Sequence, residues 1–186
     1  MLTILITLFA GVSSPPVILL CFHDRPLKGD LMQIASESDS KLDLSLKLAM
    51  KSSPVTYGGP VNPEEYTILH GWAEVDGSRK LAPGVFFGGS EELMNEVRIN
   101  RFDPKNALFV KGHAAWVAGQ LSREIAKNVW YPVAISSDLI LRYAGARTTD
   151  EDNASDLWSD VLMCLGDEFA DIARMHAARG DKRIMP

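Results

Sequence analysis

Residues 106–125 read NALFVKGHAAWVAGQLSREI and place a strand, a sharp turn and a helix in close succession. The apolar run over residues 107–110 is typical of a buried strand, which we predict over residues 106–111 and which ends at Gly112. After Gly119, apolar side chains recur at a spacing of one helical turn, which predicts a helix over residues 119–128. This passage from strand to helix holds the densest group of unusual residues in the chain.

Short strands outnumber helices in the rest of the chain. Apolar runs bounded by turn residues predict strands at residues 3–9, 17–22, 31–34, 54–61, 67–72, 84–87 and 130–135. Helical spacing predicts helices that start after the expected caps Ser90 and Ser155, and a further helix over residues 167–178. Because strands and helices do not alternate regularly, the pattern favours an α+β fold over a doubly wound parallel sheet.

Residues 41–50 carry opposing signals. Leucines at 42, 44, 46 and 48 alternate with lysine, aspartate and serine, and this period of two is typical of a half-buried strand. The same residue types have high helix propensity. We give the spacing more weight and predict a strand.

The composition is that of an ordinary globular protein. The chain has 186 residues, of which 46% are hydrophobic and 23% charged, and its length suits one domain over residues 1–186. Its 19 basic and 24 acidic residues give a net charge of −5. An acidic chain repels phosphate backbones unless its cations cluster, so direct nucleic-acid binding is disfavoured.

The cysteines and the amino-terminal stretch suggest buried structure. Cys21 and Cys164 each lie in an apolar run and are expected to be buried, and no paired Cys/His spacing predicts a metal site. Residues 2–22 are strongly apolar, but no basic residue precedes them and prolines interrupt them. Two buried strands are therefore favoured over a membrane span, with a cleaved signal peptide as the alternative.

Two strand–glycine units stand out as turns. Gly58-Gly59-Pro60 and Gly88-Gly89 each follow a short apolar strand. Paired glycines supply backbone angles that other residues avoid, so tight turns are the favoured interpretation. An anion-binding loop is the alternative, although neither a neighbouring lysine nor a directly following helix supports it at residues 58–60.

The passage beyond Gly112 is the main candidate for a functional site. Gln120 and Glu124 lie four residues apart, so they share one helix face, and Trp116 precedes them closely. Together they could line a pocket. In the alternative interpretation, Gln120 satisfies backbone groups of the loop while Trp116 fills the core.

The histidines offer a catalytic alternative. His70 lies in an apolar strand, where a histidine is usually structural. A hydrolase-like site would combine His70 or His113 with Glu124, provided that these side chains come within hydrogen-bond reach of each other. The sequence contains no nucleophile elbow, Walker loop, dinucleotide fingerprint or zinc-protease motif.

These residues also carry a resemblance to the AlgH/YqgE family. The matching segments, in family order, are Tyr57-Gly58-Gly59-Pro60-Val61, Leu69-His70, Gly84-Val85, Phe87-Gly88-Gly89-Ser90, Gly112 through Trp116, and Gly119-Gln120-Leu121-x-x-Glu124. The resemblance covers residues 17–172. It implies an α+β fold in which a coiled, partly barrel-like mixed β-sheet is flanked by a few helices, with further helices at the carboxyl end.

The resemblance also sets expectations about function. Bacterial members of that family are labelled transcriptional regulators, and the family supplies no accepted catalytic residues. This chain looks like a divergent member, and one of plant or algal type. His113, Ala115 and Ala118 depart from the family pattern, and the match dissolves around Arg25-Pro26 and over residues 28–40. A cytoplasmic or organellar location follows by analogy, including the plastid, and secretion is disfavoured.

The sequence thus predicts a non-catalytic binding or regulatory domain, with the hydrolase-like enzyme as the alternative. Its partner is expected to be a protein or a small molecule, with no cofactor, no metal and no stable membrane span. The candidate binding surface comprises Gly58, Gly59, Pro60, His70, Gly88, Gly89, Gly112, His113, Trp116, Gly119, Gln120 and Glu124.

Overall fold

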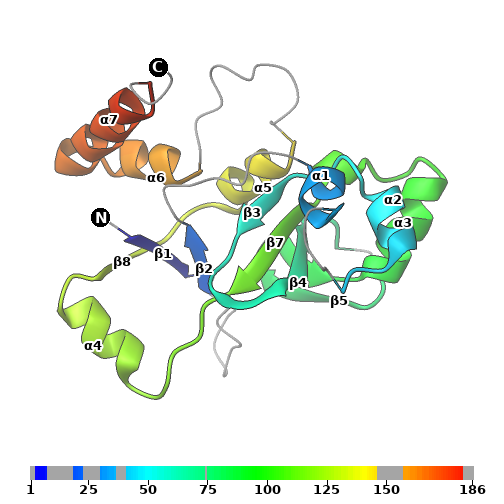
Figure 1. Ribbon diagram of the computed structural model, residues 1–186, viewed down its shortest axis with the longest axis horizontal. Helices are drawn as coiled ribbons and strands as arrows, with labels where there is room; N and C mark the ends of the chain where they lie inside the picture. Colours follow the sequence, from blue (N-terminus) through cyan, green and yellow to red (C-terminus); the bar gives the residue numbers. More distant parts are fainter. Residues whose placement is uncertain are drawn as a thin grey trace.

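The computed structural model describes residues 3–7, 19–22, 30–36, 41–73, 75–145 and 157–181 (Figure 1). Its elements in chain order are β1 Thr3–Thr7, β2 Leu19–Phe22, α1 Leu31–Ser36, α2 Leu44–Ala49, β3 Val55–Tyr57, β4 Val61–His70, β5 Ser78–Ala82, β6 Val85–Gly88, α3 Ser90–Arg98, the 3₁₀ turn η1 Pro104–Asn106, β7 Leu108–His113, α4 Gln120–Ala126, β8 Trp130–Val133, α5 Ser137–Gly145, α6 Leu157–Leu165 and α7 Asp167–Asp181.

A mixed five-stranded sheet forms the centre of the fold. Its strand order is β3-β7-β4-β6-β5, with β3 parallel to β7 and the other pairs antiparallel. The described strands leave this sheet open, with β3 and β5 at its edges. A smaller sheet, β2-β1-β8, pairs β1 antiparallel with β2 and parallel with β8. The predicted α+β class is confirmed.

The central sheet is buried on both faces. Along β7, Leu108 and Val110 belong to one hydrophobic cluster and Phe109 to the other, as expected from side chains that alternate across a strand. The first cluster includes Ile140 of α5, Leu162 of α6 and Ala173 of α7, and the second includes Leu31, Leu46 and Leu93 of α1, α2 and α3. Burial on both faces explains why β7 begins with the continuous apolar run Leu108-Phe109-Val110.

Most of the predicted elements are confirmed. The strands expected within residues 54–61, 67–72, 84–87, 106–111 and 130–135 are β3, β4, β6, β7 and β8. The described parts of residues 3–9 and 17–22 form β1 and β2, whereas the segment joining them and the expected cap Ser155 lie outside the described residues. The predicted helices over residues 119–128 and 167–178 are α4 and α7. β5 has no counterpart among the predicted strands.

The strand predicted at residues 31–34 is wrong, because this segment forms the helix α1. The backbone N–H of Gln33 donates to Oδ1 of Asp30 at 3.0 Å, and the backbone N–H of Asp30 donates to Oε1 of Gln33 at 3.3 Å. This reciprocal pair is a capping box, which satisfies backbone donors at a helix start. The spacing of Asp30 and Gln33 is the signal that the sequence interpretation overlooked.

The strand predicted at residues 41–50 is also wrong, because Asp43 caps the helix α2. Its Oδ1 accepts hydrogen bonds from the backbone N–H groups of Ser45 at 2.8 Å and Leu46 at 3.2 Å. The helix buries Leu46 and leaves Leu44 and Leu48 exposed, so the alternating leucines do not form a strand face. Helix propensity and the cap together outweighed the period-two pattern.

Two smaller predictions are also wrong. Ser90 is the first residue of α3 and not its cap; the cap position is taken by Gly89 at φ 68°, where a Cβ would collide with the Val75 side chain. Cys164, on α6, is exposed and not buried.

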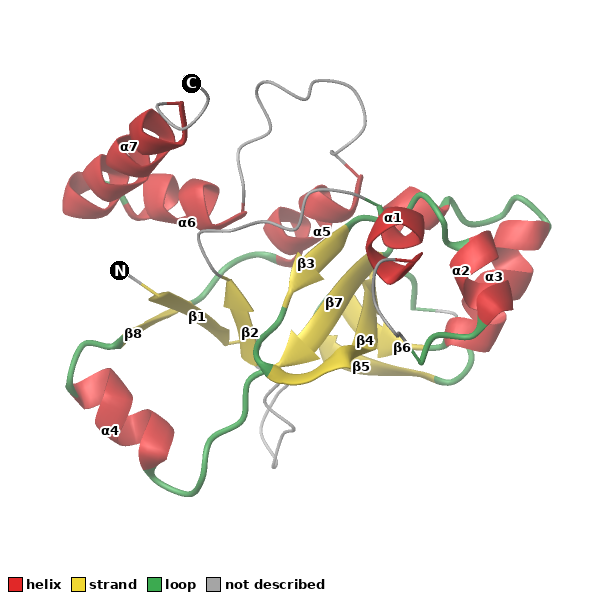
Figure 2. Cartoon of the chain, viewed as in Figure 1, coloured by secondary structure: helices red, strands yellow, loops and turns green. Residues whose placement is uncertain are grey.

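The segment between β7 and β8 projects from the rest of the fold. In Figures 1 and 2, α4 stands apart from the other helices, with loops leading into and out of it. No residue of α4 is buried. We call residues 114–129 the arm. Among the described residues, no helix is both long and apolar enough to cross a membrane.

Candidate functional site

The carboxylate of Glu124 is the centre of the arm. Its Oε2 accepts hydrogen bonds from Nε1 of Trp116 at 2.8 Å and from Nε1 of Trp130 at 2.7 Å. Its Oε1 accepts a hydrogen bond from Nε2 of Gln120 at 2.8 Å. We call these four side chains the clasp. They tie the loop before α4, the helix itself and the start of β8 to a single charged group.

The local sequence explains how the clasp forms. Gly119 occupies the cap position of α4 at φ 74°, a conformation that favours glycine, so the chain turns sharply into the helix. The backbone N–H of Val117 donates to Oε1 of Gln120 at 3.2 Å, which ties the loop to the first turn. Gln120 and Glu124, one turn apart, are joined by a hydrogen bond on one face of α4, as their spacing predicted.

The clasp holds Glu124 in its ionised form. Hydrogen bonds from Gln120, Trp130 and Trp116 lower the pKa of this carboxyl below its ordinary value, in that order of importance, and the nearby Arg123 adds to the effect. Partial burial opposes the shift but does not outweigh it. A carboxylate with a lowered pKa and three neutral donors is a weak general base, and its arrangement is that of an anchor.

The aromatic rings of the clasp lie outside both core clusters. Trp116 and Trp130 meet edge to face, with ring centroids 5.5 Å apart and an interplanar angle of 79°. Neither ring belongs to the described clusters on the two faces of the central sheet. Val117 and Val129, next to them in the chain, are 71% and 47% exposed. The arm therefore presents apolar surface that the described core does not use.

The first glycine pair serves a backbone crossing. The N–H of Gly58 donates to the carbonyl of Lys111 at 2.8 Å. A Cβ on Gly58 would overlap the carbonyl of Gly112, and one on Gly59 would overlap that of His113. Glycines are required here because the connection between β3 and β4 lies directly against the end of β7. In this crossing, Pro60 and the His113 side chain are exposed.

His70 lies in the interior at the end of β4. Its ring is fully buried and stacks on Phe86, with centroids 6.0 Å apart, and its Nδ1 accepts a hydrogen bond from the Trp72 N–H at 3.3 Å. Nε2 is buried without a hydrogen-bond partner among the described residues. Burial lowers the pKa of His70 below its ordinary value, against an opposing contribution from the Gly88 backbone.

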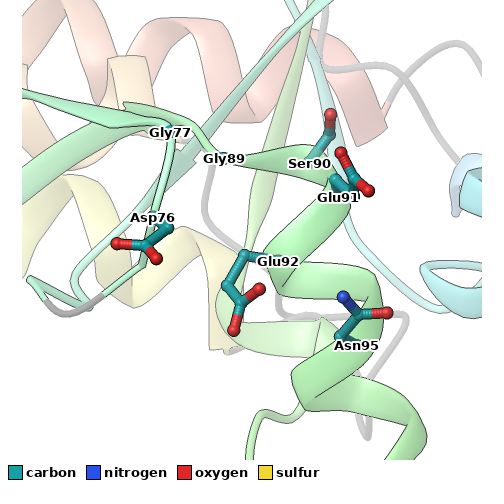
Figure 3. A pocket seen from close by; sticks show the side chains of 7 residues that line it. All are labelled: Asp76, Gly77, Gly89, Ser90, Glu91, Glu92 and Asn95. Carbon is teal, nitrogen blue, oxygen red and sulfur yellow. The ribbon is translucent and has the colours of Figure 1, made fainter.

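The second glycine pair borders an acidic hollow. Gly89 and six neighbours line a space of about 340 Å³, into which the turn before β5 and the start of α3 contribute their side chains (Figure 3). The lining residues are Asp76, Gly77, Gly89, Ser90, Glu91, Glu92 and Asn95. Among the described residues, no three His, Cys, Asp or Glu side chains are grouped so as to hold a metal ion.

The predicted site residues therefore occupy separate places. The structure brings Trp116, Gly119, Gln120 and Glu124 together in the arm, and it brings Gly58, Gly59, Gly112 and His113 together at the backbone crossing. His70 and Gly88 are neighbours near the acidic hollow. No hydrogen bond or ion pair within the described part of the chain joins either histidine to Glu124.

Comparison with known proteins assigns the chain to a family. Residues 15–170 match the model of the DUF179 family, described as AlgH-like. The chain belongs to the AlgH-like family. The match covers the central sheet, the arm and both glycine pairs, so the resemblance noted from the sequence is confirmed.

Bacterial UPF0301 proteins are relatives of this AlgH-like chain. One from Chlamydia muridarum is 32% identical over 168 residues, which cover 88% of this chain and 83% of the relative. One from Burkholderia cenocepacia is 33% identical over 140 residues, covering 68% and 71%. Their names state no activity. These relatives are bacterial and give no support to the organellar location suggested by analogy.

A solved structure is also similar to the AlgH-like chain. The solution structure of the AlgH protein from Pseudomonas aeruginosa matches with a TM-score of 0.46 and 21% sequence identity. The match covers 67% of this chain and 64% of that one.

Sequence reasoning missed one member of the site. Trp130 is not among the candidate residues that the sequence suggested, yet its indole N–H completes the clasp on Glu124. The two residues lie six apart in the chain and on different elements, so no helical or strand spacing relates them. A buried or half-buried indole N–H needs an acceptor, and this requirement is the only signal that pointed to a partner.

Proposed function

We propose that this AlgH-like chain is a non-catalytic binding domain and that the arm, residues 114–129, is its working surface. One observation carries the proposal. The half-buried and exposed apolar side chains of the arm lie outside both described cores, while the clasp holds α4 and the segments on either side of it. A surface that is already ordered before binding loses less entropy when a partner associates than a surface that becomes ordered only on binding.

The contacts of Glu124 support binding over catalysis. A general base needs a free lone pair aimed at its substrate, whereas three of the about four lone-pair positions of the Glu124 carboxylate already accept hydrogen bonds from neighbouring side chains. The histidines of the hydrolase-like alternative are engaged or placed elsewhere: His70 is buried beside Phe86, and His113 ends β7 at the backbone crossing. No observation favours the enzyme alternative.

A protein partner fits the arm better than nucleic acid does. The arm carries Arg123 and Lys127 as its only cations, on a chain with a net charge of −5. Nucleic-acid binding relies on neutralising many phosphates with clustered cations. Any regulatory role that the family label suggests would then act through contact with another protein.

Affinity capture with paired baits tests the proposal. The baits are the wild-type chain, Val117→Asp on the arm, and the matched control Met163→Asp on α6, since Met163 is also exposed, at 46%. Circular dichroism verifies that all three baits are folded. We expect a bound protein that Val117→Asp loses and Met163→Asp retains.

Two outcomes would contradict the proposal. Val117→Asp could retain every protein that the wild type retains, in which case the arm is not the working surface. Both variants could lose the same proteins, in which case binding depends on a property of the whole chain and not on the arm.

A further inference from the structure

We infer that the arm binds an acidic amphipathic helix of a partner protein, an inference that rests on the proposed function and specifies its partner. Side chains of different chemistry occupy different faces of α4. Successive residues of an α-helix are rotated by about 100°, so residues four apart share a face. The seven residues of α4 therefore form four stripes along the helix.

The stripe that faces the fold is the clasp stripe of Gln120 and Glu124. Opposite to it, Ser122 and Ala126 are exposed, and both side chains are small. A helix can approach closely along such a stripe, because no large side chain keeps it at a distance. The outer face of α4 therefore has room for a second helix.

The flanks of this outer face differ in chemistry. Leu121 and Ile125 lie on one side, half-buried and outside both described core clusters. On the other side, Arg123 and Lys127 are exposed, and neither forms an ion pair within the described part of the chain. A helix lying along Ser122 would thus meet apolar side chains on one flank and two cations on the other.

Charge decides which helix fits. The only carboxylate of the arm, Glu124, is directed into the clasp, so the outer face of α4 is cationic although the whole chain is acidic. A partner helix with a leucine stripe beside a glutamate stripe complements both flanks. The same partner is repelled by the net negative charge of the rest of the molecule, which directs it to the arm.

The clasp makes such docking favourable. A seven-residue helix is too short to be stable alone in water. The hydrogen bonds of Trp116 and Trp130 to Glu124 hold α4 against β8 before any partner arrives. Leu121 and Ile125 lie one turn apart, so a stripe of leucines that recurs at every turn of the partner helix can pack against both.

Fluorescence anisotropy with three labelled helical peptides tests the inference on the full chain. The first peptide has a leucine stripe beside a glutamate stripe; the second has lysine, and the third glutamine, in place of each glutamate. We expect the glutamate peptide to bind at least about tenfold more tightly than the glutamine peptide, because only the glutamate peptide can pair with Arg123 and Lys127. Added salt should reduce the difference.

Charge reversal on the arm provides the matched test. In Arg123→Glu/Lys127→Glu, the preference should invert, so that the lysine peptide binds more tightly than the glutamate peptide. The control Arg79→Glu/Lys80→Glu makes the same change of charge at exposed positions of the edge strand β5. It should retain the wild-type order of the three peptides.

The outcomes separate this inference from the proposed function. Equal binding of the glutamate and glutamine peptides, or absence of binding by all three, overturns the acidic-helix inference. If Val117→Asp still loses a captured protein in that case, the arm remains the working surface and only the partner chemistry is wrong. A preference for the glutamate peptide that Arg123→Glu/Lys127→Glu leaves unchanged also overturns the inference, since another surface then binds the peptide.

Discussion

Nε1 of Trp130, at the start of β8, donates a hydrogen bond of 2.7 Å to Oε2 of Glu124, on α4. Nε1 of Trp116, in the loop before α4, donates to the same oxygen, so two indoles share one carboxylate oxygen. This relationship connects the end of the arm to its beginning. It explains how a helix without any buried residue can keep a defined position beside a β-strand.

Removal of the carboxylate should loosen the arm while leaving the central sheet intact. In Glu124→Ala, both indole N–H groups and the Gln120 amide lose their acceptor. We expect the amides of α4 to exchange their hydrogens about tenfold faster or more, because the arm opens locally. Hydrogen exchange measured by mass spectrometry checks this, with the amides of β7 as the internal reference. Unchanged exchange in α4 would mean that the clasp does not hold the arm.

The clasp should persist at mildly acidic pH. The pKa of Glu124 is lowered in the folded chain, so its stabilising contribution is present above the ordinary glutamate value of 4.5 and is lost only as the pH falls through the lower folded value. The indole N–H signals of Trp116 and Trp130 in NMR spectra should therefore move only below pH 4.5. In Glu124→Gln, these signals should show no such step. A midpoint above the ordinary value would contradict the hydrogen-bond pattern.

The stability of the fold should decrease as His70 is forced to accept a proton. Burial lowers the pKa of His70 in the folded chain, so the unfolded chain binds more protons once the pH falls below the ordinary value of 6.5. Stability should thus decline from about pH 7 towards the lower folded pKa of this ring. Urea denaturation of the wild type and of His70→Asn checks this, because asparagine can still accept the Trp72 N–H. If the free energy of unfolding changes with pH by the same slope in both proteins over this range, His70 is not the source of the pH dependence.

The backbone crossing at Gly58 should be more sensitive to a methyl group than an open glycine. Gly58→Ala places a Cβ against the carbonyl of Gly112, and we expect a loss of about 2–3 kcal/mol in the free energy of unfolding. Gly166→Ala is the control, because its Cβ meets nothing within 4 Å and only its φ of 72° is unfavourable. It should cost about 1 kcal/mol. Equal losses in urea denaturation would refute the close crossing.

Local patterns predicted much of the fold. The continuous apolar run of β7 and the glycines that end β6 and precede α4 place these elements correctly, because burial and backbone freedom act within a few residues. Local patterns failed at α2, where the alternating leucines pointed to a strand. The cap at Asp43 and the pairing of the helix with α3 decided the outcome.

The candidate site shows the same division. The shared face of Gln120 and Glu124 follows from the helical period, and the two glycine pairs were recognised as tight turns. The spacing of residues in the sequence could not show whether the twelve candidate residues form one surface. In the folded chain they lie at the arm, at the backbone crossing and beside the acidic hollow.

The sequence alone determined the α+β class, the family and the helix face that carries Glu124, because each depends on residue order and local period. Only the tertiary structure decided which groups surround that carboxylate. Trp116 and Trp130 reach it from a loop and from a strand, and the position of that strand is set by its parallel pairing with β1 at the far end of the chain. A hydrogen bond between separate elements depends on how the whole chain packs, and no local spacing encodes it.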